Sequence, residues 1–173
     1  MRQLADADRI RAFMRGLGRA GAQPGRVFLA GGATAVLLGW RATTVDVDLK
    51  LVPDQDSVLR AIPALKESLD LNVELAAPDD FIPVRDGWVD RSPYVAQEGR
   101  LTFHHFDLSA QALAKIERGH ARDLADVREM LDRGLVSRER LREDFTAIQP
   151  RLYRYPAIDP RAFRRALDAA LRE

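Results

Sequence analysis

The chain has 173 residues and a net charge of +1, with 46% hydrophobic and 31% charged residues, which is typical of a globular protein. It contains no cysteine, so disulfides and thiolate metal sites are excluded. No apolar run is long enough to cross a bilayer, and residues 1–25 lack the apolar core of a signal peptide. We therefore expect a cytoplasmic protein that does not contact a membrane.

Hydrophobic periodicity and turn residues predict an alternating half followed by an all-helical half. In chain order we expect a helix at 4–19, a strand at 26–30, a helix at 33–40, a strand at 44–52, a helix at 54–69, strands at 70–76 and 100–108, and helices at 109–119, 121–134, 138–148 and 161–172. Residues 77–94 are expected to be irregular, apart from a strand at 87–90. Ser109, Ser137 and Asp159 are the expected N-caps of three of the later helices.

This order of elements predicts an α+β fold, with a small mixed β-sheet flanked by helices and a C-terminal helical part. Residues 1–108, including the first helix, are expected to form the α/β core. Residues 109–173 are expected to form the helical part, packed on that core.

Charge is unevenly distributed along the chain. Residues 1–41 carry seven arginines against two acids, residues 42–90 carry four basic against eleven acidic groups, and residues 137–173 carry nine arginines against six acids. This distribution of charge is expected if an acidic metal centre lies between basic surfaces that bind a polyanion. It is equally expected if the arginines lie on surface helices without such a function, and both interpretations stay open.

Two aspartates, Asp46 and Asp48, lie inside the apolar run TVDVDLKLV. Residues i and i+2 of a strand point to the same face, about 6.5–7 Å apart, so the two carboxylates should project together, opposite Val45, Val47 and Leu49. A divalent cation resolves their repulsion, and such oxygen ligands favour Mg²⁺ or Mn²⁺ with substrate phosphates. A solvated sheet edge is the alternative explanation for this motif taken alone.

A glycine pair, Gly31 and Gly32, precedes the helix expected at 33–40. Such a turn exposes backbone N–H groups to a phosphate and permits close approach, because glycine has no Cβ. Thr34 adds a hydroxyl donor nearby. A tight turn without a ligand explains the glycines equally well, but here the turn and the aspartates lie on adjacent elements.

A third carboxylate, Glu74, lies between two apolar residues of the strand expected at 70–76. If that strand pairs with the strand that carries the aspartates, Glu74 reaches their face. It would then be a third metal ligand, or a base that deprotonates an attacking hydroxyl. A solvent-facing strand position is the alternative.

The helical half carries Lys115 and Arg118 at i, i+3, and Asp123 and Asp126 with the same spacing on the next helix. The chain has 24 arginines but only three lysines, and Lys115 lies within an apolar stripe, which indicates a specific role such as phosphate binding. Two surface helices with ordinary ion pairs within each helix are the alternative.

Histidines and aromatic residues give weaker signals. His104 and His105 alternate faces of a strand, so at most one lines a site, and ordinary sheet positions explain both. The C-terminal segment interleaves arginines with Tyr153, Tyr155 and Phe163. This pattern suits a single-stranded RNA end, and equally a docking segment for the last helix.

The stretch GGATAVLLGWRATTVDVDL resembles the signature of the DNA-polymerase-β-type nucleotidyltransferase superfamily, in which a glycine pair opens a helix and two aspartates follow on the next strand. The stretch LAKIERGHARDLADVREML is similar to the lysine-, arginine- and aspartate-containing motif of AbiEii-type toxins of type IV toxin–antitoxin systems, with the MenT group nearest. Together the matches cover residues 27–131. The resemblance implies a minimal nucleotidyltransferase fold.

Roles for individual residues follow from this resemblance. Gly31 and Gly32 would hold the triphosphate of an NTP, and Ala33 stands where the family more often has Thr or Ser. Asp46 and Asp48 would bind metal ions and act in catalysis. Glu74 would be the third carboxylate, which binds metal and acts in catalysis. Lys115 would act in catalysis and contact the triphosphate. The other residues implied in nucleotide binding are Thr34, Arg41, Thr44, Arg118, Asp123 and Asp126.

These observations predict a nucleotidyltransferase that uses Mg²⁺ or Mn²⁺ to move NMP from an NTP to an acceptor hydroxyl. The resemblance implies a toxin that modifies the tRNA 3′ end and is paired with an antitoxin protein. One alternative is AMP transfer to a protein or to a small molecule such as an aminoglycoside. Another is a non-catalytic nucleotide-binding or partner-binding module.

Overall fold

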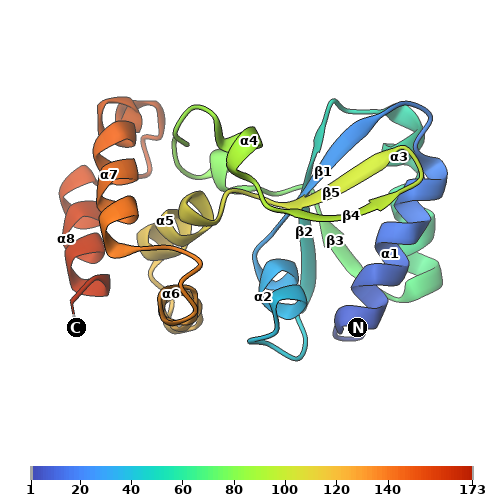
Figure 1. Cartoon of the computed structure of the whole chain (residues 1–173), viewed down its shortest axis with the longest axis horizontal. Coiled ribbons are helices and arrows are strands. Elements are labelled where there is room, and N and C mark those ends of the chain that lie inside the picture. The colour runs from blue at the N-terminus through green and yellow to red at the C-terminus, as the bar shows by residue number, and fades with distance from the viewer. Residues whose placement is uncertain (1, 173) are drawn as a thin grey trace. The chain divides into compact units, whose positions relative to one another are not determined.

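The computed structural model describes residues 2–172, which form two compact units. Residues 2–77 and 92–106 make up the first unit, and residues 78–91 and 107–172 make up the second. The chain therefore leaves the first unit after residue 77, returns to it for a β-hairpin, and leaves it again after residue 106 (Figure 1). No helix in the described part of the chain is long and apolar enough to span a membrane.

A five-stranded mixed sheet organises the first unit, in the order β3-β2-β1-β5-β4. Pairing is parallel between β1 and β5 and between β2 and β3, and antiparallel between β1 and β2 and between β4 and β5. The strands are β1 (Gly25–Ala30), β2 (Asp46–Val52), β3 (Asn72–Glu74), β4 (Tyr94–Glu98) and β5 (Leu101–His105). With the flanking helices this confirms the predicted α+β fold.

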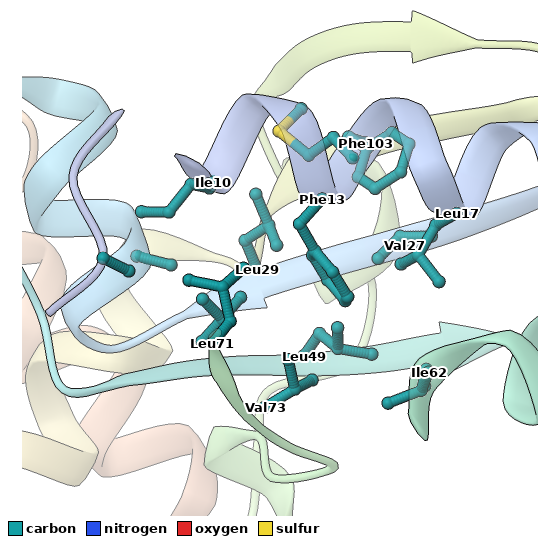
Figure 2. Packing of buried hydrophobic residues seen from close by; sticks show 14 of the residues in the cluster. Ile10, Phe13, Leu17, Val27, Leu29, Leu49, Ile62, Leu71, Val73 and Phe103 are labelled. Atoms are coloured by element: carbon teal, nitrogen blue, oxygen red, sulfur yellow. The ribbon is translucent and has the colours of Figure 1, made fainter. Parts of the chain in front are cut away.

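The core of the first unit lies between one face of the sheet and two helices, α1 (Ala7–Ala20) and α3 (Asp56–Leu69). Figure 2 shows side chains of α1, such as Phe13, packed among residues of the central strands, such as Leu29 and Leu49. Phe13 and Phe103 have no solvent exposure, so truncating either to alanine should cost about 3–5 kcal/mol.

Strand β2 presents its two faces as the period-two pattern predicts. Val47, Leu49 and Leu51 are buried in the core, whereas Asp46 and Asp48 are half-buried on the opposite face. Val45, which was expected to join the apolar face, precedes the strand and is 54% exposed. The two carboxylates of β2 therefore lie on the side of the strand opposite the core.

The second unit is helical. Its elements are η1 (Pro78–Asp80), α4 (Trp88–Arg91), α5 (Leu108–Arg118), α6 (Ala121–Asp132), α7 (Arg138–Ile148), η2 (Gln149–Arg154) and α8 (Pro160–Ala170). The side chains of Ser137 and Asp159 cap α7 and α8 as predicted. The N-cap of α5 is Asp107 rather than Ser109, which lies inside the helix.

Long-range contacts bind residues 78–91 to the helices of the second unit. Arg85 donates to Asp144 of α7 at 2.8 Å, and the Tyr155 hydroxyl donates to the Asp79 carbonyl at 2.7 Å. The strand expected at 87–90 is wrong, because this stretch forms the single turn α4. That turn is secured by Arg91, which donates to the carbonyls of Arg85 and Asp86 and to the Asp107 carboxylate.

Candidate active site

The pairing of β2 with β3 fixes the positions of three predicted carboxylates. In this parallel register Asp46 lies opposite Asn72, and Asp48 lies opposite Glu74. The Asn72 amide donates a hydrogen bond to Asp46 Oδ1. Side chains at directly opposed positions share a face of the sheet, so Glu74 lies on the same face as the aspartates, as expected if the strands pair. Unlike them, Glu74 is exposed.

The glycine turn stands directly against Asp48. Gly31 has φ +61° and ψ −133°, a conformation that L side chains rarely adopt. A Cβ at Gly31 would lie 2.7 Å from Asp48 Oδ2. Glycine is therefore required twice here, for the backbone angle and for the approach of the turn to the carboxylate.

Gly32 makes an equally close approach to the segment that leads into β2. A Cβ at this position would lie 1.9 Å from Thr44 Oγ1 and 3.4 Å from Arg41 Nη1. Thr44 is buried, and its hydroxyl donates to the Asp46 carbonyl at 3.1 Å. The structure thus brings the glycine pair, Arg41, Thr44 and Asp48 together around one turn.

Thr34 and His105 form a contact that the sequence did not reveal. Thr34 is 1% exposed in α2 (Gly32–Leu38), and its Oγ1 lies 3.0 Å from His105 Nδ1 and 3.3 Å from the Leu29 carbonyl oxygen. The hydroxyl expected to face a phosphate is therefore turned inward. It ties the first turn of α2 to the ends of β1 and β5.

The electrostatic state of His105 suits this anchoring role. Burial, together with the charges of Arg11 and His104, lowers the pKa of His105 to about 4. Its imidazole is consequently neutral near pH 7. Tandem histidines at the end of a strand were the only sequence signal for this residue, and an ordinary sheet position explained them equally well.

The carboxylate face fits a metal ion that brings further ligands with its substrate. Among residues 2–172 there is no group of three or more His, Asp or Glu side chains arranged to hold a metal ion, so Glu74 does not complete a three-carboxylate cage with the aspartates. Mg²⁺ keeps several waters and binds through one or two carboxylates plus substrate phosphates. Two aspartates on one strand beside a glycine turn match that donor set.

The remaining predicted site residues lie in the second unit, where α5 and α6 pair through charges. Lys115 Nζ lies 2.7 Å from Asp126 Oδ2 and 3.8 Å from Asp123 Oδ1. Arg118 donates to both carboxylate oxygens of Asp123, at 2.6 and 2.7 Å. Lys115, Asp123 and Asp126 are buried, whereas the Arg118 side chain is 60% exposed.

This four-residue charge cluster is internally neutral. Burial raises the pKa of Asp123, but the hydrogen bonds and charge of Arg118, together with the charges of Lys115 and His120, outweigh burial and lower this pKa overall. Both aspartates and both cations are thus engaged in interhelical pairs, not in the surface pairs within one helix that were the alternative interpretation. The expected contact of Lys115 with a triphosphate stays a prediction.

The mixed sheet, the glycine turn and the paired aspartates together define a nucleotidyltransferase-type domain. A family model described as "Nucleotidyltransferase of unknown function (DUF6036)" matches residues 9–159, and the chain belongs to this family. The match supports the resemblance to nucleotidyltransferases, but it does not support the AbiEii/MenT branch specifically. No curated protein and no solved structure matches the chain.

Proposed function

We propose that this protein is a metal-dependent nucleotidyltransferase that transfers NMP from an NTP to an acceptor hydroxyl and releases pyrophosphate. The observation that carries the proposal is the approach of Gly31 to Asp48, with Asp46 on the same face of the same strand. A glycine turn at the start of a helix and two carboxylates beside it are two of the parts that phosphoryl transfer uses.

In this proposal Asp46 and Asp48 hold Mg²⁺ or Mn²⁺, which, when bound, neutralises charge on the triphosphate and orients it. The backbone N–H groups at Gly31 and Gly32 face the triphosphate oxygens. The acceptor oxygen forms a bond to the α-phosphorus, and the bond from that phosphorus to the bridging oxygen of pyrophosphate breaks. The acceptor's proton passes to Glu74 as the base, or to water.

Three further residues of the first unit, Arg41, Thr44 and Thr34, belong to the proposed site. Arg41 and Thr44 flank the glycine turn, where Arg41 would contribute a positive charge to the triphosphate. Thr34 would act through its buried hydroxyl, by fixing the first turn of α2, rather than by touching phosphate.

Residues of the second unit enter the proposal through the resemblance. Lys115 and Arg118 would contact the triphosphate or support the residues that do, and Asp123 and Asp126 would set the positions of these cations. The ion pairs of Lys115 with Asp126 and of Arg118 with Asp123 support such a positioning role.

The acceptor proposed on the resemblance is a tRNA 3′ end, which would make the protein a translation-inhibiting toxin with an antitoxin partner. AMP transfer to a protein or a small molecule uses the same donor half of the site. The family description, a nucleotidyltransferase of unknown function, is compatible with each acceptor.

A labelling experiment tests the proposal. The purified chain is incubated with Mg²⁺, with each NTP labelled at the α-phosphate, and with total bacterial RNA or total protein; Asp48→Asn is the control. Metal-dependent label in tRNA-sized RNA, lost in the variant, is the expected result. Label in protein would replace the RNA acceptor, and NTP binding without transfer to any acceptor would contradict the proposed activity.

A further inference from the structure

The second unit contains a groove that the proposed transfer reaction does not use. It has a volume of about 600 Å³ and runs between α6 and α8. Leu124, Val127 and Leu131 of α6 line one wall, and Ile116 of α5 contributes to its base. The opposite wall is formed by the alanines of α8.

The groove exists because its two walls differ in side-chain size. The α6 residues recur at i, i+3 and i+7, which places them on one helical face. The facing residues of α8 are Ala166, Ala169 and Ala170, whose methyl groups do not reach across. Leu124 and Leu131 consequently stay partly exposed, although each has the hydrophobicity of a core residue.

The rim of the groove is positively charged. Arg128, Arg138 and Arg172 border it, against a single carboxylate from Asp132. No Asp or Glu within residues 2–172 forms an ion pair with any of these three arginines. The Arg138 Nε donates to the Leu171 carbonyl at 3.1 Å, which holds this guanidinium at the border.

We propose that this groove binds an acidic amphipathic helix of a partner protein. An apolar trough between two helices accepts the hydrophobic face of a third helix, in the manner of helix-in-groove recognition. Carboxylates on the flanks of that helix would meet the three rim arginines, and such charge complementarity selects the partner and speeds association. The inference rests on the second unit alone and does not depend on the nucleotidyl-transfer proposal.

The probe for this proposal is a fluorescein-labelled peptide of about 18 residues, with leucines at i, i+3, i+4 and i+7 spacing and glutamates at the other positions. Fluorescence anisotropy with the full chain should show saturable binding, weakened by salt because the rim is charged. The same peptide with lysines in place of glutamates should not bind. Binding of both peptides alike, or of neither, would overturn the proposal.

Two variants separate the rim from the trough. Arg128→Glu combined with Arg172→Glu should weaken binding of the acidic peptide at least tenfold, since two cations become anions. Ala169→Trp keeps every charge and fills the trough, and it should weaken binding to a similar degree. Arg161→Glu combined with Arg165→Glu makes the same change of net charge at two exposed positions of α8 outside the groove. It is the matched control and should leave binding unchanged.

Thermal unfolding and sedimentation of each variant complete the test. All variants should unfold cooperatively near the wild-type temperature, so that lost binding reports the surface and not the fold. Equal peptide binding by the rim, trough and control variants would refute the assignment. Self-association of the chain that Ala169→Trp abolishes would identify a second copy as the occupant and overturn the acidic-helix proposal.

Discussion

The molecule has two pairs of aspartates with different surroundings, Asp46 with Asp48 and Asp123 with Asp126. The sequence resemblance implies that both pairs belong to one site. Asp123 and Asp126 are each 2% exposed and are held by Lys115 and Arg118. Asp46 and Asp48 are half-buried on the face of the sheet opposite the core, where the uncharged amide of Asn72 donates to Asp46.

The difference teaches that a carboxylate pair is a ligand-binding site only where the fold leaves its face accessible. Breaking a buried ion pair costs several kcal/mol, because one charge stays behind without its partner. A half-buried pair on a sheet face instead gains stability from a ligand that arrives with positive charge. Mutations of the first pair should therefore lower activity with little loss of stability. Mutations of the second pair should lower stability, in addition to any effect on the triphosphate contacts proposed for Lys115 and Arg118.

The largest expected effect is on activity. Asp46→Asn should lower the rate of nucleotidyl transfer by roughly 10²- to 10⁴-fold. The reason is that the variant loses a ligand of the metal ion, and a bound metal ion stabilises the transition state by several kcal/mol. The free energy of unfolding should change by no more than about 1 kcal/mol. Rate measurements with labelled NTP and urea unfolding check the two parts. Normal transfer by this variant would break the comparison.

Lys115→Met should have the largest effect on stability. Removing the buried ammonium leaves Asp126 without its 2.7 Å partner and should cost about 3–5 kcal/mol. Thermal unfolding measures the change. Lys66→Met, on a partly exposed side chain of α3, is the control and should shift the free energy of unfolding by about 0.5 kcal/mol or less. Adding Asp126→Leu to Lys115→Met should restore part of the lost stability. If Lys115→Met alone left the free energy of unfolding unchanged, the cluster would not be structural.

His105 should make stability depend on pH. Its pKa is lowered from 6.5 to about 4 in the folded protein, so between these values the unfolded state binds a proton that the folded state does not. The free energy of unfolding should therefore rise with pH across this window, by on the order of 3 kcal/mol for this residue.

Substitution of His105 isolates that contribution. His105→Gln should flatten the slope of stability against pH, which urea unfolding across the window measures. His104→Gln is the comparison, since burial also lowers the pKa of His104 but that side chain is only partly buried. An equal change of slope in both variants would argue against a special environment for His105.

Gly31→Ala should lower the free energy of unfolding by about 1–3 kcal/mol, because alanine is strained at φ +61°. Gly39→Ala is the matched control, since Gly39 also has a positive φ of 99° but nothing lies within 4 Å of a Cβ there. Thermal unfolding should show a loss of stability for both variants, and a larger one for Gly31→Ala because its Cβ also meets Asp48 Oδ2. Only Gly31→Ala should also weaken metal-dependent NTP binding, because its Cβ meets Asp48. Equal NTP affinity in both variants would contradict the proposed role of the Gly31–Gly32 turn in triphosphate binding.

Sequence reasoning succeeded where local patterns decide the structure. The alternation of β2 placed Asp46 and Asp48 on one face, and the caps Ser137 and Asp159 marked helix starts, because both effects act within a few residues. The glycine pair indicated a close approach, although not that its neighbours would be Asp48 and Thr44.

The remaining features depend on partners distant in sequence. Strand β4 was missed because none of its residues is fully buried and its pairing is irregular between Tyr94 and Ala96, so it shows no clear period of two. The Thr34–His105 contact joins residues 71 positions apart, and the Lys115–Asp126 pair required the packing of α5 on α6. No local pattern carries such information.

The most direct test of the central claim compares two acidic positions in one assay. Wild type, Asp48→Asn and Asp144→Asn are incubated with Mg²⁺ and NTP labelled at the α-phosphate, with total RNA and total protein as acceptors. Asp144 is a buried carboxylate paired with Arg85 and Arg140, so its variant should lose stability and keep transfer at temperatures where it is folded. Transfer by wild type and Asp144→Asn but not by Asp48→Asn is the predicted result. Equal transfer by all three proteins would contradict the account.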